Sequence, residues 1–206
     1  MNGGKYRGEG GVRGTVEIKM EEQTPSRDRS SILGSSQDHP APVGVTVKTK
    51  IERGDRYSAP EIYNLEITLL EVVHGKEAIE RIKAQGVSNK LPKAGYEYIL
   101  VRIRFGYFSK ARGFGHAHEA YRIGDGSFSA TSADGNTEYE IPSVIRQPQP
   151  QLVGISFSAG ESREGWIVLQ VPETEKEPLL SFHREYAENV YGVWGSVWFQ
   201  LYDSSR

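Results

Sequence analysis

Alternation of apolar and polar residues is the feature that most constrains the fold of this 206-residue chain. From about residue 45 onward, apolar side chains recur at every second position, which is the period of a β-strand with one buried face. In one long segment, 95–105, the apolar face carries Ile99, Val101, Ile103 and Phe105. Arg102 and Arg104 share the opposite face. The pattern predicts antiparallel strands with one side in a core and the other in solvent.

The same period recurs along the rest of the chain and sets the fold class. The other alternating segments are 45–51, 63–72, 128–131, 137–141, 152–157, 165–171 and 191–201. Leu69 and Leu70 are both apolar, which predicts a β-bulge where the register changes. Asp134-Gly135 predicts a hairpin between two of the segments. Seven to nine short strands with regular turns predict an all-β, immunoglobulin-like antiparallel β-sandwich with Greek-key connections.

One segment departs from the alternation. In residues 75–84, Ala78, Ile79 and Ile82 follow helical spacing. Glu77 and Arg81 form an i,i+4 pair of opposite charge, which supports a helix. We expect one short helix here, crossing between two strands.

The alternation also predicts which side chains form the core. The expected core residues are Leu65, Ile67, Leu69, Ile99, Val101, Ile103, Phe105, Ile167, Leu169, Val197 and Phe199. A register error of one residue would place this whole set on the solvent face, so the burial of these residues tests the predicted register directly.

The first part of the chain differs from the rest in composition. Residues 1–42 are rich in glycine, serine and proline, and Tyr6 is their only aromatic residue. Such a stretch buries too little apolar surface to offset its backbone entropy, so we expect a flexible arm. Within it, the segment 14–20 alternates briefly and is a candidate to pair with a sheet edge. Residues 43–206 are expected to form one domain.

Composition excludes several classes of function. Basic and acidic residues nearly balance, giving a net charge of −2, so no overall field favours nucleic acid or an anionic membrane. The chain has no cysteine, which excludes disulfides, thiolate nucleophiles and Cys-ligated zinc. Its longest apolar runs are far shorter than the ~20 residues of a transmembrane helix. No secretory signal, a charged start followed by an apolar stretch, is visible at the beginning of the sequence. The sequence does not indicate an oligomeric state.

Two stretches resemble a known family. The first is the run 63–78 (YNLEITLLEVVHGKEA) with 95–101 (GYEYILV), and the second is Gly160-Glu161 with 165–172 (GWIVLQVP). Together they resemble an immunoglobulin-like family of unknown function on bacterial lipoproteins and secreted or surface proteins, related in fold to small secreted mycobacterial antigens. The resemblance covers roughly residues 42–202. It implies an extracytoplasmic, surface or membrane-anchored location, with the cytoplasm as the alternative, and it supplies no catalytic residue or ligand.

Metal binding has little support in the sequence. His116 and His118 in a His-x-His pattern would share a strand face, as a zinc or copper site needs, but a third ligand such as Asp125 or His183 must come from elsewhere. A solvated, glycine-rich loop between strands explains the pair better. Asp125-Gly126 and the segment 134–136 lack the oxygen ligands of a calcium loop and are typical of turns. We expect no metal and no cofactor.

Catalysis also has little support. Glu161, Glu164 and Asp203 are the carboxylates that a glycosidase would need, yet their spacing does not show that any two lie close together. The sequence has no Gly-x-Ser-x-Gly motif and no phosphate-binding glycine loop. We therefore expect a chain that is not an enzyme.

Tryptophan residues are the predicted binding residues. Trp194 and Trp198 lie on the face opposite Val197 and Phe199, and Trp166 likewise opposes its apolar neighbours. Exposed, they would form an aromatic surface for a sugar or a protein partner. The alternative is that they pack beneath the helix, the arm or a long loop. The sequence thus favours a non-enzymatic cell-envelope module that binds a protein or a glycan. The alternatives are a β-sandwich hydrolase with a carboxylate pair and a structural spacer domain.

Overall fold

A computed structural model places the chain in two packed β-layers with one helix. It describes residues 32–53, 61–84, 91–109, 120–142, 148–184 and 195–202. Within these ranges there are nine strands and one α-helix, and the strands pair in antiparallel sheets. This confirms the predicted all-β sandwich with a short helix. No helix in the described ranges is long and apolar enough to cross a membrane.

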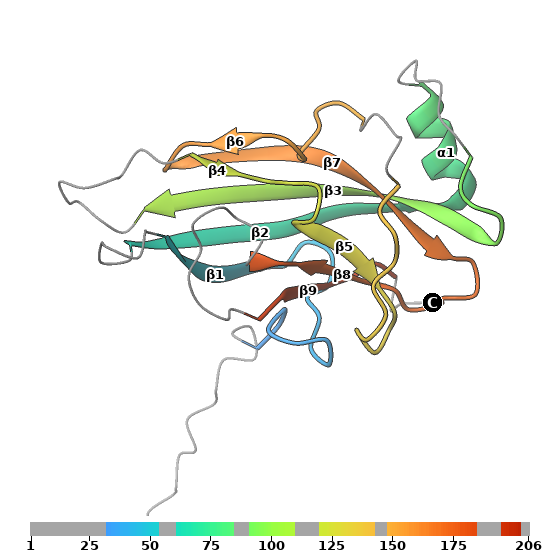
Figure 1. Cartoon of the computed structure of the whole chain (residues 1–206), viewed down its shortest axis with the longest axis horizontal. Coiled ribbons are helices and arrows are strands. Elements are labelled where there is room, and N and C mark those ends of the chain that lie inside the picture. Colours follow the sequence, from blue (N-terminus) through green and yellow to red (C-terminus); the bar gives the residue numbers. More distant parts are fainter. Residues whose placement is uncertain are drawn as a thin grey trace, which may run out of the picture.

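The larger layer is a sheet of four strands in the order β1-β2-β3-β7, which follow one another from the lower to the upper part of Figure 1. Its strands are β1 (Thr46–Arg53), β2 (Glu61–His74), β3 (Tyr96–Ser109) and β7 (Glu161–Pro172). Each neighbouring pair is antiparallel. The predicted bulge is confirmed, because the register of β2 against β3 shifts between Leu69 and Glu71. Leu69 before the shift is buried in the core, and Val72 after it is partly buried against the same core.

The second layer consists of shorter strands that close the core from the other side (Figure 1). One group has the order β5-β8-β9, and β4 pairs with β6 in a two-stranded ladder. Their bounds are Phe128–Thr131 for β5, Leu179–Phe182 for β8, Val197–Gln200 for β9, Tyr121–Arg122 for β4 and Ser156–Phe157 for β6.

The predicted helix is confirmed as α1 (Gly75–Ala84), which connects β2 to β3. It packs on the outer face of the four-stranded sheet, at the end where β3 begins (Figure 1). Its Ala78 and Ile82 are buried there with residues of β2, β3 and β7. Arg81 of the helix donates hydrogen bonds to Glu71 and, one turn back, to Glu77. The helix therefore covers one end of that face and leaves the other end uncovered by it.

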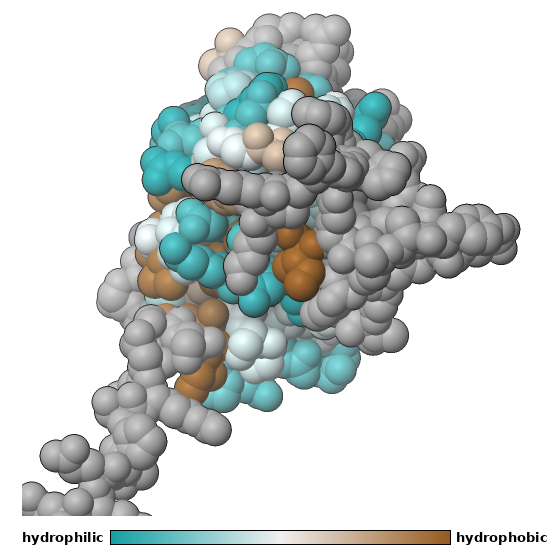
Figure 2. Space-filling model, turned by 90° about the vertical axis from the view of Figure 1, so that its left-hand side faces the viewer, coloured by the Kyte–Doolittle hydropathy of each residue, from teal (hydrophilic) through white to brown (hydrophobic). Residues whose placement is uncertain are grey.

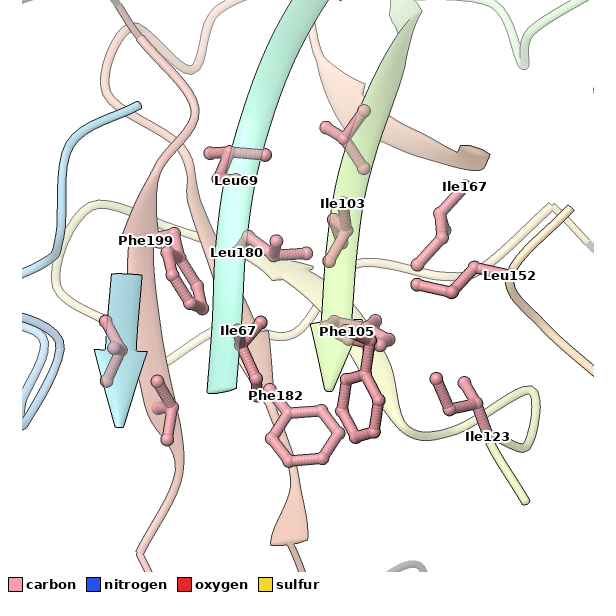
Figure 3. Packing of buried hydrophobic residues seen from close by; sticks show 14 of the residues in the cluster. Ile67, Leu69, Ile103, Phe105, Ile123, Leu152, Ile167, Leu180, Phe182 and Phe199 are labelled. Carbon is pink, nitrogen blue, oxygen red and sulfur yellow. The ribbon is translucent and has the colours of Figure 1, made fainter. Parts of the chain in front are cut away.

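All eleven residues predicted to form the core are buried, none more than 3% exposed. Figure 3 shows part of this core between the two layers, with Ile67, Ile103 and Phe105 of the larger sheet against Leu180 and Phe182 of β8. Phe105 is the central ring: its centroid lies 5.1 Å from that of Phe157 and 5.6 Å from that of Phe182. The alternation thus assigned the buried face of each long strand correctly.

Three predicted strands are shorter in the structure than the alternation suggests. Of 191–201, β9 covers Val197–Gln200, and the described residues 195, 196 and 201 are not part of a strand. Of the predicted strand 137–141, only a single bridge between Thr131 and Glu138 is formed. Of 152–157, only the last two residues are β6. The chain turns at Gly154, whose φ of +82° favours glycine, and an apolar side chain at every second position does not reveal such a turn.

The predicted arm extends less far than residue 42. The structure packs the described part of it, residues 32–42, against β9: the Trp198 amide donates to the Gly34 carbonyl and the Gln200 amide donates to the Ala41 carbonyl. Ala41 is fully buried in the core. The predicted boundary after residue 42 is therefore wrong for this stretch, because backbone pairing with a sheet edge needs no apolar pattern. Residues 1–31, including the candidate strand 14–20, lie outside the described ranges.

A threonine in β5 gives a prediction about stability. Thr131 is 3% exposed, and its hydroxyl has no hydrogen-bond partner among the described residues. Thr131→Val, which keeps the shape and removes the hydroxyl, is expected to raise the free energy of unfolding by about 1 kcal/mol in urea denaturation. Thr68→Val is the control, since the Thr68 hydroxyl is bonded to Thr46 at 2.8 Å and its loss should lower stability. A loss of stability in both variants would contradict this.

Candidate functional site

The outer face of the four-stranded sheet divides into three zones along the strands. The pairing register places Lys50, Asn64 and Phe108 in one row across β1, β2 and β3. The next outward-facing row holds Lys48, Glu66 and Gly106. Further along come the arginines of β3, and beyond them α1 covers the sheet. The zone without helix cover is the one where β3 ends.

Arginines and a glutamate fill the middle zone. Glu164 of β7 accepts hydrogen bonds from Arg102 at 2.6 Å and from Arg104 at 2.6 and 3.0 Å. The bonds from Arg104, together with the charge of both guanidinium groups, hold the pKa of Glu164 below its ordinary value. A general acid needs the opposite shift. Glu164, one of the carboxylates that the sequence singles out, is therefore an ionised cross-strand anchor here.

Of the other two carboxylates that the sequence singles out, the structure describes Glu161. Glu161 accepts hydrogen bonds from the Arg163 guanidinium and the Ser158 amide, both at 3.0 Å. Asp203 lies outside the described residues. Glu161 and Glu164 are thus each occupied by their own cations or amides.

An open pocket of about 390 Å³ lies in the zone where β3 ends. Its lining residues are Lys48, Thr49, Lys50, Asn64, Leu65, Glu66 and Phe108. Most of them are outward-facing residues of β1, β2 and β3. Figure 2 looks at this end of the molecule and shows hydrophobic side chains between hydrophilic ones. The pocket therefore combines an apolar surface with charged and amide groups.

Gly106 and Phe108 give the pocket its shape. Both face outward in β3, and the Phe108 ring leans over Gly106: a Cβ at position 106 would lie 2.6 Å from Cε2 of that ring. A side chain at position 106 would push the ring away from the sheet. Glycine in this strand interior thus allows an aromatic ring to lie flat against the backbone of its neighbours. Phe108 itself is half-buried, so part of the ring faces solvent.

The polar groups around this ring differ in whether another side chain already binds them. The Lys48 ammonium lies 2.9 Å from the Glu66 carboxylate. Neither the Lys50 ammonium nor the Asn64 side-chain amide has a side-chain partner within the described ranges. An amide, an ammonium and a carboxylate beside an aromatic ring can exchange hydrogen bonds with a ligand that stacks on the ring.

A second polar cluster lies on the outer face of the smaller sheet, around His183. The His183 Nε2 atom is 2.8 Å from the Ser129 hydroxyl and 3.0 Å from the Ser181 hydroxyl. Its Nδ1 atom is 3.1 Å from the Ser196 hydroxyl. The Glu138 carboxylate approaches Nε2 at 3.9 Å. The cluster joins residues from β5, from β8 and from the segments that follow β8 and precede β9.

The geometry of this cluster fits a structural network better than a nucleophilic site. Ser129 and Ser181 are fully buried, so neither hydroxyl can meet a substrate in this arrangement. Ser196 is less buried, but the carboxylate that would orient His183 is beyond hydrogen-bond distance. The imidazole instead satisfies buried hydroxyls that would otherwise be costly.

The two predicted tryptophans that the structure describes lie on different sheets: Trp166 on β7 and Trp198 on β9. Trp166 is half-buried and packs against the cluster beneath α1, and the Arg102 guanidinium lies 5.9 Å from its ring centre. Trp198 is half-buried on the outer face of the other layer, where a Cβ at Gly135 would lie 3.0 Å from its ring. Trp166 thus lies beside the helix and Trp198 beside a loop, and both stay partly exposed. Trp194 lies outside the described residues.

The predicted turn at Asp134 is present in the structure. Asp134 accepts hydrogen bonds from Ser132 and Asn136, and these lower its pKa to about 2. This is the Asx-type turn that the sequence predicts. Within the described ranges, no three His, Cys, Asp or Glu side chains are grouped closely enough to hold a metal ion. His116 and His118 lie outside those ranges.

Sequence reasoning missed Phe108 as a site residue. The signal that could have found it is Gly106, a glycine inside a long strand, two positions before an outward-facing aromatic residue. Comparisons with known proteins add no candidate: no family model, no curated protein and no solved structure matches this chain.

Proposed function

We propose that this chain is a non-enzymatic binding module that holds a glycan in the pocket at Phe108. The observation that carries the proposal is an open pocket in which a half-exposed aromatic ring is bordered by Lys50, Asn64 and the Lys48–Glu66 pair. Placement in the bacterial cell envelope is part of the proposal and rests on the sequence resemblance alone.

Sugar chemistry suits this combination of groups. The C–H face of a sugar ring packs on an aromatic ring, and its hydroxyls both donate and accept hydrogen bonds. Asn64 offers both kinds of group, the lysines donate and Glu66 accepts. A pocket of about 390 Å³ is near the lower end of the roughly 300–1,000 Å³ typical of small-ligand sites. It lies on strands, which hold their side chains in fixed register.

The pocket also fits an extended ligand better than a compact one. Its lining residues come from three neighbouring strands of one sheet, so a ligand chain that lies across the strands can contact all of them. A protein partner would gain less from it, because stable protein interfaces cover about 800 Å² on each side and centre on buried anchors. A protein ligand is therefore the second outcome that the binding experiment below distinguishes.

Phe108→Ala is expected to weaken glycan binding at least about tenfold, because it removes the surface on which a sugar ring stacks. Binding is measured by isothermal titration calorimetry against neutral and acidic oligosaccharides, with the ligands first found on an oligosaccharide array. Phe108→Tyr is the matched control: it keeps the ring and should keep the affinity within about threefold.

Two results would contradict the proposal. One is that no oligosaccharide of either kind binds, and the other is that Phe108→Ala binds as tightly as the original chain. Release of reducing ends from a bound oligosaccharide would instead support the hydrolase alternative. In that case Glu161→Gln and Glu164→Gln identify the carboxylate responsible.

A further inference from the structure

We infer that the ligand of the Phe108 pocket is an acidic oligosaccharide, whose carboxylate or sulfate group pairs with Lys50. This inference rests on the proposed function and adds the chemical class of the ligand to it. Its basis is the uneven distribution of charge across the outer face of the larger sheet.

Cations outnumber carboxylates on this face. From the row of Lys50 to that of Arg102, the outward-facing cations that the structure describes on the strands are Lys48, Lys50, Arg102 and Arg104, and the carboxylates are Glu66, Glu71 and Glu164. Glu71 is engaged by Arg81 of α1. Glu66 is engaged by Lys48, and a single carboxylate, Glu164, is shared by both arginines. The face thus carries an excess of positive charge, although the whole chain has a net charge of −2.

The excess is concentrated beside the aromatic ring. Lys50 has no carboxylate within 4 Å in the described part of the chain, and it stands in the same cross-strand row as Asn64 and Phe108. Strands in a sheet lie about 4.8 Å apart, so the backbones of Lys50 and Phe108 are about 10 Å apart. A ligand of two or more sugar rings can therefore stack on Phe108 and present an acid group to Lys50, with Asn64 between them.

The charge of the ligand is also expected to change its affinity for the pocket. A neutral sugar leaves the Lys50 ammonium without a counter-charge at the edge of the pocket, whereas an ionised acid group forms a charge-assisted hydrogen bond with it. The nearby guanidinium groups add to the positive potential, which guides an anion toward the face and weakens as salt concentration rises. Acidic and neutral ligands should therefore differ both in affinity and in dependence on salt.

The test compares a galacturonic acid oligomer with its methyl ester, which keeps the sugar backbone and removes the negative charge. The acid form is expected to bind at least about fivefold more tightly at low salt, and raising NaCl from 50 to 500 mM should remove most of that difference. A sulfated oligosaccharide of similar length is measured in parallel to identify which acid group is preferred.

Lys50→Gln is expected to abolish the preference for the acid form, so that the acid and its ester bind with about equal affinity. Lys176→Gln is the matched control, since Lys176 is exposed in the loop after β7 and bonds only a backbone carbonyl, that of Glu173, within the described residues. It should leave both affinities unchanged. Circular dichroism checks that each variant folds.

The outcomes distinguish the inference of an acidic ligand from the proposed glycan function. If neutral oligosaccharides bind and acidic ones bind no better, or if Lys50→Gln leaves the acid preference intact, the inference is overturned and the proposed glycan function stands. If neither acidic nor neutral oligosaccharides bind, the proposed function itself is overturned. Preference for the acid form that Lys50→Gln removes supports both.

Discussion

Phe105→Ala is expected to lower the free energy of unfolding by about 3–5 kcal/mol, because it removes the ring that joins the two layers. Phe105 is fully buried, and its ring contacts those of Tyr121, Phe157 and Phe182, which come from β4, β6 and β8. Deleting it creates a cavity that three different strands would have to collapse to fill. Urea denaturation followed by circular dichroism measures the change.

Phe108→Ala is the matched control, since it removes the same side chain from the other face of the same strand. Phe108 is half-buried and its loss should cost less than about 1 kcal/mol. The pair separates stability from binding, because the variant expected to lose affinity is the one expected to stay folded. Equal losses of stability would mean that β3 is out of register by one residue.

The second large effect is expected at Gly165, where two backbone segments touch. A Cβ at this position would lie 2.8 Å from both the Gln151 carbonyl carbon and the Leu152 amide nitrogen. This contact holds the segment 150–152 beside β7, where the Trp166 amide donates to the Pro150 carbonyl. Gly165→Ala should therefore lower the free energy of unfolding by about 1–3 kcal/mol, because backbone atoms cannot move aside as a flexible side chain can.

Gly124→Ala serves as its control. A Cβ there would meet nothing nearer than the Ser127 hydroxyl at 3.9 Å, an ordinary contact. It should change stability by less than about 0.5 kcal/mol in the same urea denaturation. A similar loss in both variants would show that the backbone contact at Gly165 is not the cause.

Alternation in the sequence was sufficient to predict the fold class and the core. Each long strand buries one face against the other layer, so the period of two carries through from the sequence to burial at Leu65, Ile103 and Ile167. The helix was predictable for a similar reason, since Ala78 and Ile82 lie one turn apart and are both buried. Boundaries were less predictable: edge pairing holds the backbone of residues 34–41 with few apolar side chains.

The candidate site could not be predicted in the same way, because alternation tells which face a residue occupies but not what covers that face. Trp166 and Phe108 both face outward from the larger sheet, yet α1 packs on Trp166 and leaves Phe108 beside an open pocket. Which end the helix covers depends on how it docks after His74, a tertiary contact that no local pattern encodes. The His183 network likewise joins Ser129 to Ser196, residues that are far apart in the sequence.

The proposed glycan function is tested most directly by an NMR titration of the 15N-labelled chain with the oligosaccharide that binds most tightly. The account predicts that the amide signals that shift belong to the ends of β1 and β3 and the start of β2, centred on Lys50, Asn64 and Phe108. Signals around Trp166 and Trp198 should stay in place. Shifts centred on either tryptophan, or no shifts with any oligosaccharide, would contradict it.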